Sequence, residues 1–223
     1  MKDHSIDDRK ALTFNRRKDF FLFSPPEAGM CIFVAAMHNG RIILNQAQFQ
    51  LTIERLCHQL IEEFDSFERT CLIGIQPRGV VLANRLHQRL LSILDIPTIE
   101  YGVLDITFYR DDFRIRSKPL KASVTDMPFL VEGKNVLLVD DVLYSGRTVQ
   151  AALTALQHYG RPRQVELVAM VDRRFNRHLP IQPDFAGLRV DALDEAYVKV
   201  EWKEKEPEDR ILIYANREDS ESK

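Results

Sequence analysis

The chain has 223 residues, of which 45% are hydrophobic and 29% are charged, and its formal net charge is -2. This composition predicts a folded domain with a substantial core, and the balanced charge argues against a protein-wide basic surface for nucleic acid. The three cysteines form no CxxC pair, which argues against a zinc site or a disulfide framework. No apolar run approaches the roughly 20 residues of a membrane helix, so we expect a cytoplasmic protein without a membrane partner.

The first 34 residues differ from the rest because no hydrophobic period is sustained there and charges of both signs are mixed. We expect residues 1–34 to be a mobile extension that is dispensable for catalysis, followed by one domain over residues 35–223. Met37 lies just ahead of the strand-like run GRIIL, so a native start at Met37 is an alternative to the longer chain.

Helical and strand patterns alternate from Asn45 onward. Apolar residues at helical spacing predict an amphipathic helix from Asn45 to Phe64, and a second helical pattern runs from Val81 to Ile93. Short apolar runs predict strands over residues 71–75 and 98–104. The segment between them, QPRG, reads as a turn after the first of these strands.

The second half of the chain continues this alternation. We expect a strand over residues 136–139, a helix over 148–159 that ends at Gly160, a strand over 164–171, and two short strands in AYVKV and ILIY. Such alternation predicts a parallel sheet with helices on both faces, with ligands bound at the carboxyl ends of its strands. Three breaks fall at such ends, in QPRG, DDVLYSGRT and DRRFNRH.

The stretch VLLVDDVLYSGRT, residues 136–148, joins an apolar strand to two adjacent carboxylates, Asp140 and Asp141. Ionised carboxylates accept hydrogen bonds from a vicinal diol. Ser145, Gly146 and Thr148 then precede a helix N-terminus, where hydroxyl and backbone N–H groups bind anions. Solvated aspartates before a capped helix are the structural alternative, but the complete string favours a ribose 5-phosphate site. The common nucleotide loops GxxxxGK[ST] and GxGxxG are absent from the sequence.

This stretch resembles the ribose-phosphate signature of type I phosphoribosyltransferases. DITFYRDD (residues 105–112), GRP (160–162), VDR (171–173) and LPI (179–181) narrow the resemblance to the pyrimidine operon regulator family, PyrR, over residues 41–216. The resemblance implies an α/β type I phosphoribosyltransferase fold with a central, mostly parallel sheet, a small hood and a flexible lid loop. It also implies a uracil phosphoribosyltransferase, which forms UMP and pyrophosphate from uracil and phosphoribosyl pyrophosphate (PRPP), and a homo-oligomer such as a dimer.

The resemblance also assigns roles to residues. It makes Asp140, Asp141 and Arg110 catalytic, and it implies a ribose-phosphate site formed by Asp140, Asp141, Val142, Leu143, Tyr144, Ser145, Gly146, Arg147 and Thr148. It implies that pyrophosphate is bound by Pro77, Arg78, Gly79 and Arg110, and that residues 108–127 form the lid, with cations at Arg114, Arg116, Lys118 and Lys121. Mg²⁺ would arrive with PRPP and be held by substrate oxygens and water, without a dedicated protein site.

The base would be contacted by Arg161, Val171, Asp172 and Arg173. Residues 174–178, which the resemblance places over the base as part of the hood, are altered and one residue longer than the family pattern. Base selectivity is therefore open, and a purine-type phosphoribosyltransferase is an alternative. His178 is either a surface residue or a shifted family histidine.

Members of the PyrR family also bind messenger RNA as attenuators, so an RNA-binding regulator that senses UMP or PRPP with little turnover is a further alternative. Arg55 and His58 match the RNA-contacting positions of the first helix. Glu54 replaces a hydroxyl residue there, and Glu62 and Glu63 make the region acidic. Because like charge opposes phosphate binding, we expect any RNA binding to be weak and strongly dependent on salt.

Overall fold

The fold is that of a computed structural model, which describes residues 40–111, 123–192 and 196–221. The expected extension, residues 1–34, lies outside the described residues. So do Arg114, Arg116, Lys118 and Lys121 of the expected lid. The domain boundary at residue 35 and the behaviour of the lid therefore stay predictions.

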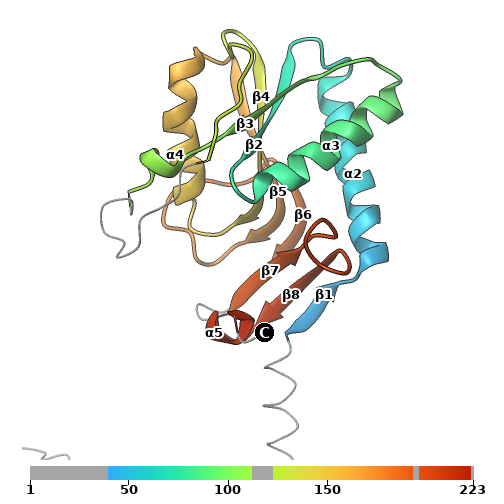
Figure 1. The fold of residues 1–223 in the computed structure, drawn as a ribbon, viewed down its shortest axis with the longest axis vertical. Coiled ribbons are helices and arrows are strands. Elements are labelled where there is room, and N and C mark those ends of the chain that lie inside the picture. Colours follow the sequence, from blue (N-terminus) through green and yellow to red (C-terminus); the bar gives the residue numbers. More distant parts are fainter. Residues whose placement is uncertain (1–39, 112–122, 193–195, 222–223) are drawn as a thin grey trace, which may run out of the picture.

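A five-stranded sheet, parallel throughout, forms the centre of the molecule (Figure 1). Its spatial order is β3 (Glu100–Leu104), β2 (Thr70–Ile75), β4 (Asn135–Leu143), β5 (Gln164–Arg173) and β6 (Phe185–Val190). This confirms the expected α/β fold class. Sequence patterns did not predict β6, an edge strand that is half-buried along most of its length and contains Gly187. An edge strand of this kind shows neither an apolar run nor a clean alternation.

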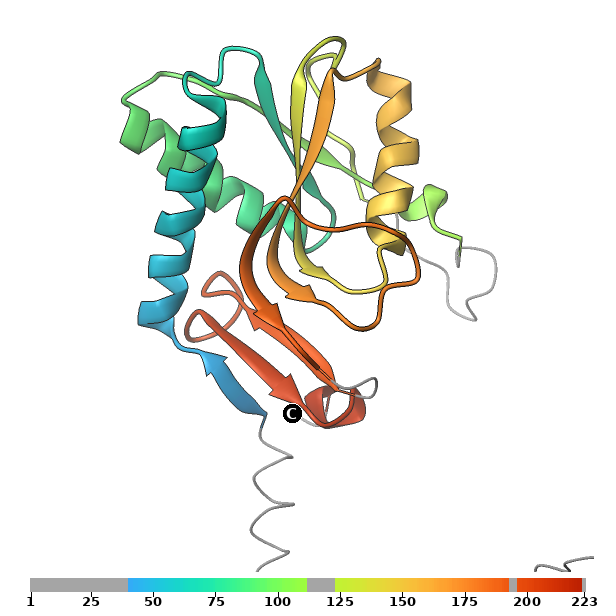
Figure 2. The ribbon, with the colours of Figure 1, turned by 180° about the vertical axis from the view of Figure 1, so that it is seen from behind.

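Helices cover both faces of the sheet (Figures 1 and 2). On one face lie α2 (Gln46–Phe64) and α3 (Gly79–Leu94), and on the other lies α4 (Arg147–Leu156), which continues as the 3-10 turn η2 (Gln157–Tyr159). Asn45 caps α2: its side chain accepts from the Gln48 amide at 3.0 Å, and the Gln48 side chain accepts from the Asn45 amide at 3.1 Å. This reciprocal pair satisfies two amides at the helix start and explains where the helical pattern begins.

A second, antiparallel sheet lies below the carboxyl ends of the central strands (Figure 2). This small sheet has the order β1 (Arg41–Leu44), β8 (Arg210–Tyr214) and β7 (Tyr197–Glu201), and α5 (Glu218–Glu221) follows it. Its outer loop is fixed to α3 by Arg85, which bonds Glu204 at 2.7 Å and Asp209 at 2.7 Å. Trp202 packs edge-on against Phe49 of α2 at 5.1 Å. This small sheet stands beside the central sheet where a hood was expected, but residues 174–178, which were expected to belong to the hood, are not part of it.

The expected end of β4 at Val139 is wrong by four residues. Pairing of β4 with β2 stops at Val139, but pairing with β5 continues to Leu143. Asp140 and Asp141 therefore lie within the last part of β4 that pairs with β5. Because β5 extends beyond the end of β2 on that side, their side chains are only 6% and 5% exposed. In the part of the chain that the structure describes, no helix is long and apolar enough to cross a membrane.

Candidate active site

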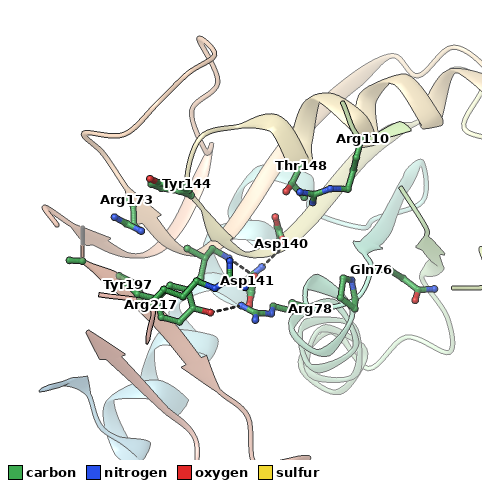
Figure 3. Close-up of a pocket in the computed structure, with 14 residues that line it drawn as sticks. Gln76, Arg78, Arg110, Asp140, Asp141, Tyr144, Thr148, Arg173, Tyr197 and Arg217 are labelled. Carbon is green, nitrogen blue, oxygen red and sulfur yellow. Dashed lines mark hydrogen bonds between the residues drawn. The ribbon is translucent and has the colours of Figure 1, made fainter. Parts of the chain in front are cut away.

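A cavity of about 500 Å³ opens where the carboxyl ends of β2, β4 and β5 meet the small sheet. Most of the side chains that line it are polar or charged, and they come from both sheets (Figure 3). The complete lining is Gln76, Pro77, Arg78, Arg110, Asp140, Asp141, Val142, Tyr144, Thr148, Arg173, Ala196, Tyr197, Val198 and Arg217.

The turn between β2 and α3 is pressed against β4. Its Gln76–Pro77 bond is cis, and Gly79 begins α3 directly beside the β4 backbone. A Cβ at Gly79 would lie 2.2 Å from the Val139 carbonyl oxygen, so only glycine permits this approach. The close approach brings Pro77 and Arg78 to the same cavity as Asp140 and Asp141, as the sequence predicted.

Asp140 and Asp141 form a buried carboxylate pair. Burial raises the pKa of Asp140 well above its ordinary value, and the charge of Asp141 raises it further. Burial also raises the pKa of Asp141, although Arg78 opposes this effect. Ionising two adjacent buried carboxyl groups together costs a large free energy, because burial and their mutual repulsion both oppose it. The pair therefore favours a ligand that supplies hydrogen-bond donors or positive charge.

Arg78 lies beside this pair, and its Nη1 atom donates to the Tyr197 hydroxyl at 3.3 Å (Figure 3). Burial lowers the pKa of Arg78, but Asp141 and Tyr197 more than offset this, so the net shift is upward. The guanidinium therefore remains a cation at the cavity wall, in a position to bind phosphate oxygens. Arg110, which follows the short 3-10 helix η1 (Thr107–Tyr109), lines the cavity as well.

Residues 144–148, named the phosphate loop after the role that the sequence predicts for them, lead from β4 into the first turn of α4. Gly146 adopts φ +90° at the N-cap of α4 and has no side chain to cap the helix, while the Ser145 hydroxyl accepts from the Arg147 amide at 3.5 Å. Uncapped N–H groups and the positive end of the helix dipole make such a terminus an anion site. Tyr144 and Thr148 reach the cavity, whereas Leu143 is buried in the core beneath α4. Ser145 and Arg147 belong to the loop but do not line the cavity.

The predicted base contacts do not all gather here. Arg173 lines the cavity and lies over the Tyr144 ring at 4.3 Å. Val171 is buried in the core, and Asp172 faces a different cavity, where it pairs with Arg177. The expectation for Arg161 is wrong. Its backbone amide donates to the Glu132 carboxylate, and its carbonyl accepts from the Gly133 amide. These contacts place Arg161 just before β4 and β5, at the amino ends of the strands and far from the carboxyl ends that border the cavity.

The expectation that residues 174–178 cover the base is also wrong. No member of this segment lines the main cavity; Arg174, Arg177 and His178 line a second one of about 660 Å³. The wall of the main cavity is formed instead by Ala196, Tyr197 and Val198 at the start of β7, and by Arg217 after β8. Sequence reasoning missed these residues because AYVKV indicated only a strand, and no motif marks Arg217.

Arg55 lies on α2, and its guanidinium donates to the Gly187 carbonyl of β6 at 2.5 Å and to the Ala186 carbonyl at 3.2 Å. It thereby covers part of the open edge of β6. His58 is exposed on the same helix. An arginine held by backbone carbonyls is less available for RNA phosphates than a solvated one.

The described residues contain no group of three or more histidine, cysteine, aspartate or glutamate side chains that could hold a metal ion. Asp140 and Asp141 are the carboxylates that line the main cavity. This set suits a cation that receives its remaining ligands from substrate and water.

Comparison with known proteins identifies the family. The model of the phosphoribosyl transferase domain matches residues 40–205. The chain is 38% identical over 180 residues to the "Bifunctional protein PyrR" of Bacillus cereus (strain AH820) and to that of Bacillus thuringiensis subsp. konkukian (strain 97-27); each match covers 80% of this chain and 99% of the relative. The chain belongs to the PyrR family of phosphoribosyl transferases.

Solved structures agree with this fold. A hypoxanthine phosphoribosyltransferase from Staphylococcus aureus superposes with a TM-score of 0.59 at 19% identity, over 79% of this chain and 94% of that one. The hypoxanthine phosphoribosyltransferase of Trypanosoma cruzi gives a TM-score of 0.59 at 15% identity, over 79% of this chain and 97% of the other. At these identities the likeness establishes only that the PyrR family member shares their fold.

Proposed function

We propose that this member of the PyrR family is a uracil phosphoribosyltransferase that converts uracil and PRPP into UMP and pyrophosphate. The observation that carries the proposal is the buried Asp140–Asp141 pair, which shares one cavity with Arg78 and with the uncapped start of α4. Carboxylates for a diol, a cation for pyrophosphate and a helix N-terminus for a phosphate match the three polar parts of PRPP.

The three parts of PRPP are assigned as follows. Asp140 and Asp141 accept hydrogen bonds from the ribose hydroxyls. The phosphate loop binds the 5-phosphate, and Arg78 and Arg110 bind the pyrophosphate. The base is assigned to Val142, Arg173 and Tyr197, which line the same cavity. Arginine only donates hydrogen bonds, which suits the exocyclic carbonyl oxygens of uracil.

The reaction is a displacement at C1 of the ribose. A bond forms between uracil N1 and C1 while the bond from C1 to pyrophosphate breaks. The electron pair of the broken bond leaves with pyrophosphate, and the N1 proton passes to pyrophosphate or water. Positive charge develops on the ribose in an oxocarbenium-like transition state, which the nearby carboxylates stabilise. The remaining contribution of the protein is to hold the two substrates in line.

Mg²⁺ fits this site. The buried carboxylate pair has raised pKa values, and a cation next to it would favour the ionised form. Asp140 and Asp141 would hold the ion together with substrate oxygens and water. When bound, Mg²⁺ would neutralise charge on the pyrophosphate.

Steady-state turnover with PRPP and a panel of bases tests the proposal. Uracil, hypoxanthine and guanine are supplied separately, and nucleotide formation is followed by chromatography together with pyrophosphate release. We expect UMP formation with a kcat/KM well above that of either purine. Preferential use of hypoxanthine or guanine would establish the purine alternative instead.

RNA regulation receives less support from the described surface of α2. Arg55 is held by the β6 carbonyls, and Glu54 is paired with Arg89 of α3 at 2.6 Å. Absence of turnover with every base, together with tight binding of UMP and of an RNA hairpin at physiological salt, would make the regulator the principal function.

A further inference from the structure

The proposed reaction does not use residues 174–178, although Arg177 and His178 at the end of this segment contact the phosphate loop. We infer that Arg177 and His178 are positioning residues, which hold the phosphate loop in the orientation that binds the 5-phosphate of PRPP. The inference rests on the proposed function and concerns the same site.

Three polar contacts join the two segments. The Nη1 atom of Arg177 donates to the carbonyl oxygen of Tyr144. The amide of His178 donates to the carbonyl oxygen of Ser145 at 3.0 Å. The Nε atom of Arg147 donates to Nδ1 of His178 at 3.3 Å. Arg177 and His178 line the second cavity and not the main one, so they contact the phosphate loop from its outer side.

Apolar packing extends the contact beyond residue 178. The position of a Cβ at Gly146 would lie 3.3 Å from Ile181 Cδ1 and 3.4 Å from Leu179 Cβ. Ile181 and Leu179 are themselves joined by a hydrogen bond from the Ile181 amide to the Leu179 carbonyl at 2.8 Å. This compact turn therefore covers the back of Gly146, the residue with the left-handed backbone conformation.

These contacts have a direct consequence for the amides of the loop. In a trans peptide the C=O and N–H groups point to opposite sides of the chain. Holding the Tyr144 and Ser145 carbonyls on the outer side turns the amides of Ser145 and Gly146 away from the second cavity. Tyr144 and Thr148 line the main cavity on that opposite side, where the 5-phosphate is proposed to bind.

Asp172 acquires a role in this arrangement. Its carboxylate pairs with Nη2 of Arg177, and the side chains are 7% and 16% exposed. Arg177 thus bridges the end of β5 to Tyr144 with both of its terminal nitrogens. Because a guanidinium is planar and rigid, fixing one nitrogen on Asp172 orients the other toward the carbonyl. The structure accordingly assigns Asp172 to the phosphate loop through Arg177, and not to the base.

Arg177→Ala tests the inference. We expect the KM for PRPP to rise about 10-fold, as the loss of a charge-assisted hydrogen bond predicts, with little change in the KM for uracil. Ribose 5-phosphate, titrated by calorimetry, should lose affinity by about the same factor, whereas inorganic pyrophosphate should bind as before. The calorimetric titration measures ribose 5-phosphate binding and does not require turnover. Loss of affinity in Arg177→Ala would therefore support the positioning role even if the protein does not form UMP.

Arg174→Ala is the matched control. Arg174 also lines the second cavity, but it pairs with Asp191 at 2.5 Å and makes none of the three contacts to the phosphate loop. The control removes the same charge from the same cavity and should leave the PRPP and ribose 5-phosphate affinities unchanged. Equal losses in the two variants would show a general electrostatic effect and would overturn the positioning role.

His178 provides a second, independent variant. His178→Ala removes only the Arg147 contact and should raise the KM for PRPP about 3-fold, and His178→Asn should restore it because the amide oxygen can accept from Arg147. If Arg177→Ala does not fold, Arg177→Ala with Asp172→Asn removes the buried unpaired charge and is measured in its place. Unchanged ribose 5-phosphate affinity in a folded Arg177 variant would refute the inference.

Discussion

The two walls of the main cavity are built in different ways. On the side of the central sheet, each functional group lies close to the carboxyl end of a strand: Arg78 after β2, Asp140 and Asp141 in the last part of β4, and Arg173 at the end of β5. On the side of the small sheet, Tyr197 and Arg217 are placed by packing over long sequence distances, through Arg85 with Asp209 and through Phe49 with Trp202. The first wall therefore carries local sequence motifs, and the second does not.

The comparison predicts that the central-sheet wall dominates catalysis. Replacing both Asp140 and Asp141 with Asn should lower kcat/KM by about 1000-fold or more, because ribose and its developing charge lose their acceptors. The fold should persist, since Asn retains the oxygen that accepts the adjacent backbone amide in each case. Circular dichroism and pyrophosphate release measure the two effects, and unchanged kinetics would exclude the phosphoribosyl reaction.

Arg78→Ala and Arg110→Ala should have the next largest effects. We expect the KM for PRPP and the Kd for pyrophosphate to rise about 100-fold, because a partly buried charge-assisted contact with phosphate is lost. Uracil affinity should change much less. Arg163→Ala, an exposed arginine at the amino edge of the sheet, is the control. Equal losses for all ligands would indicate that Arg78 or Arg110 maintains structure and does not bind phosphate.

The small-sheet wall should contribute less. Tyr197→Phe keeps the ring beside Arg217 but removes the hydroxyl that accepts from Arg78. Because Arg78 keeps its attraction to Asp141, we expect only about a 3-fold rise in the Kd for pyrophosphate. A loss as large as that of Arg78→Ala would show that the two walls act as one unit.

The smallest expected effect is on stability. Since the pKa of Asp140 is raised above the ordinary value of 3.8, the folded protein binds this proton more tightly than the unfolded chain. Stability contributed by the protonated form is therefore lost as pH rises from about 4 through the raised pKa. Asp140→Asn should melt at least about 2 °C above the parent near pH 7, and the difference should disappear near pH 4. A lower melting temperature of Asp140→Asn than of the parent at pH 7 would contradict the conclusion that burial destabilises the ionised Asp140 carboxylate.

Sequence patterns predicted the features that depend on local physics. Periodicity located α2, α3 and α4, and the adjacent polar residues after apolar runs located Arg78, Asp140 and Asp141. The same patterns missed β6 and the roles of Tyr197 and Arg217, because an edge strand and a wall built by long-range packing have no local signature. Arg161 and Asp172 were misplaced for a related reason: neighbours along a motif can face opposite edges or opposite sides of a sheet.

The small sheet has a consequence for how the protein matures. Its central strand β8 pairs with β1 through Arg41 and Ile213, two residues that lie at opposite ends of the described chain. During synthesis the central strands can pair as soon as β5 emerges from the ribosome, but β8 must be made before β1 has a partner. The central-sheet wall of the main cavity can therefore form before the opposing wall, and a ribosome-bound chain that lacks β8 lacks the central strand of the small sheet that closes the cavity.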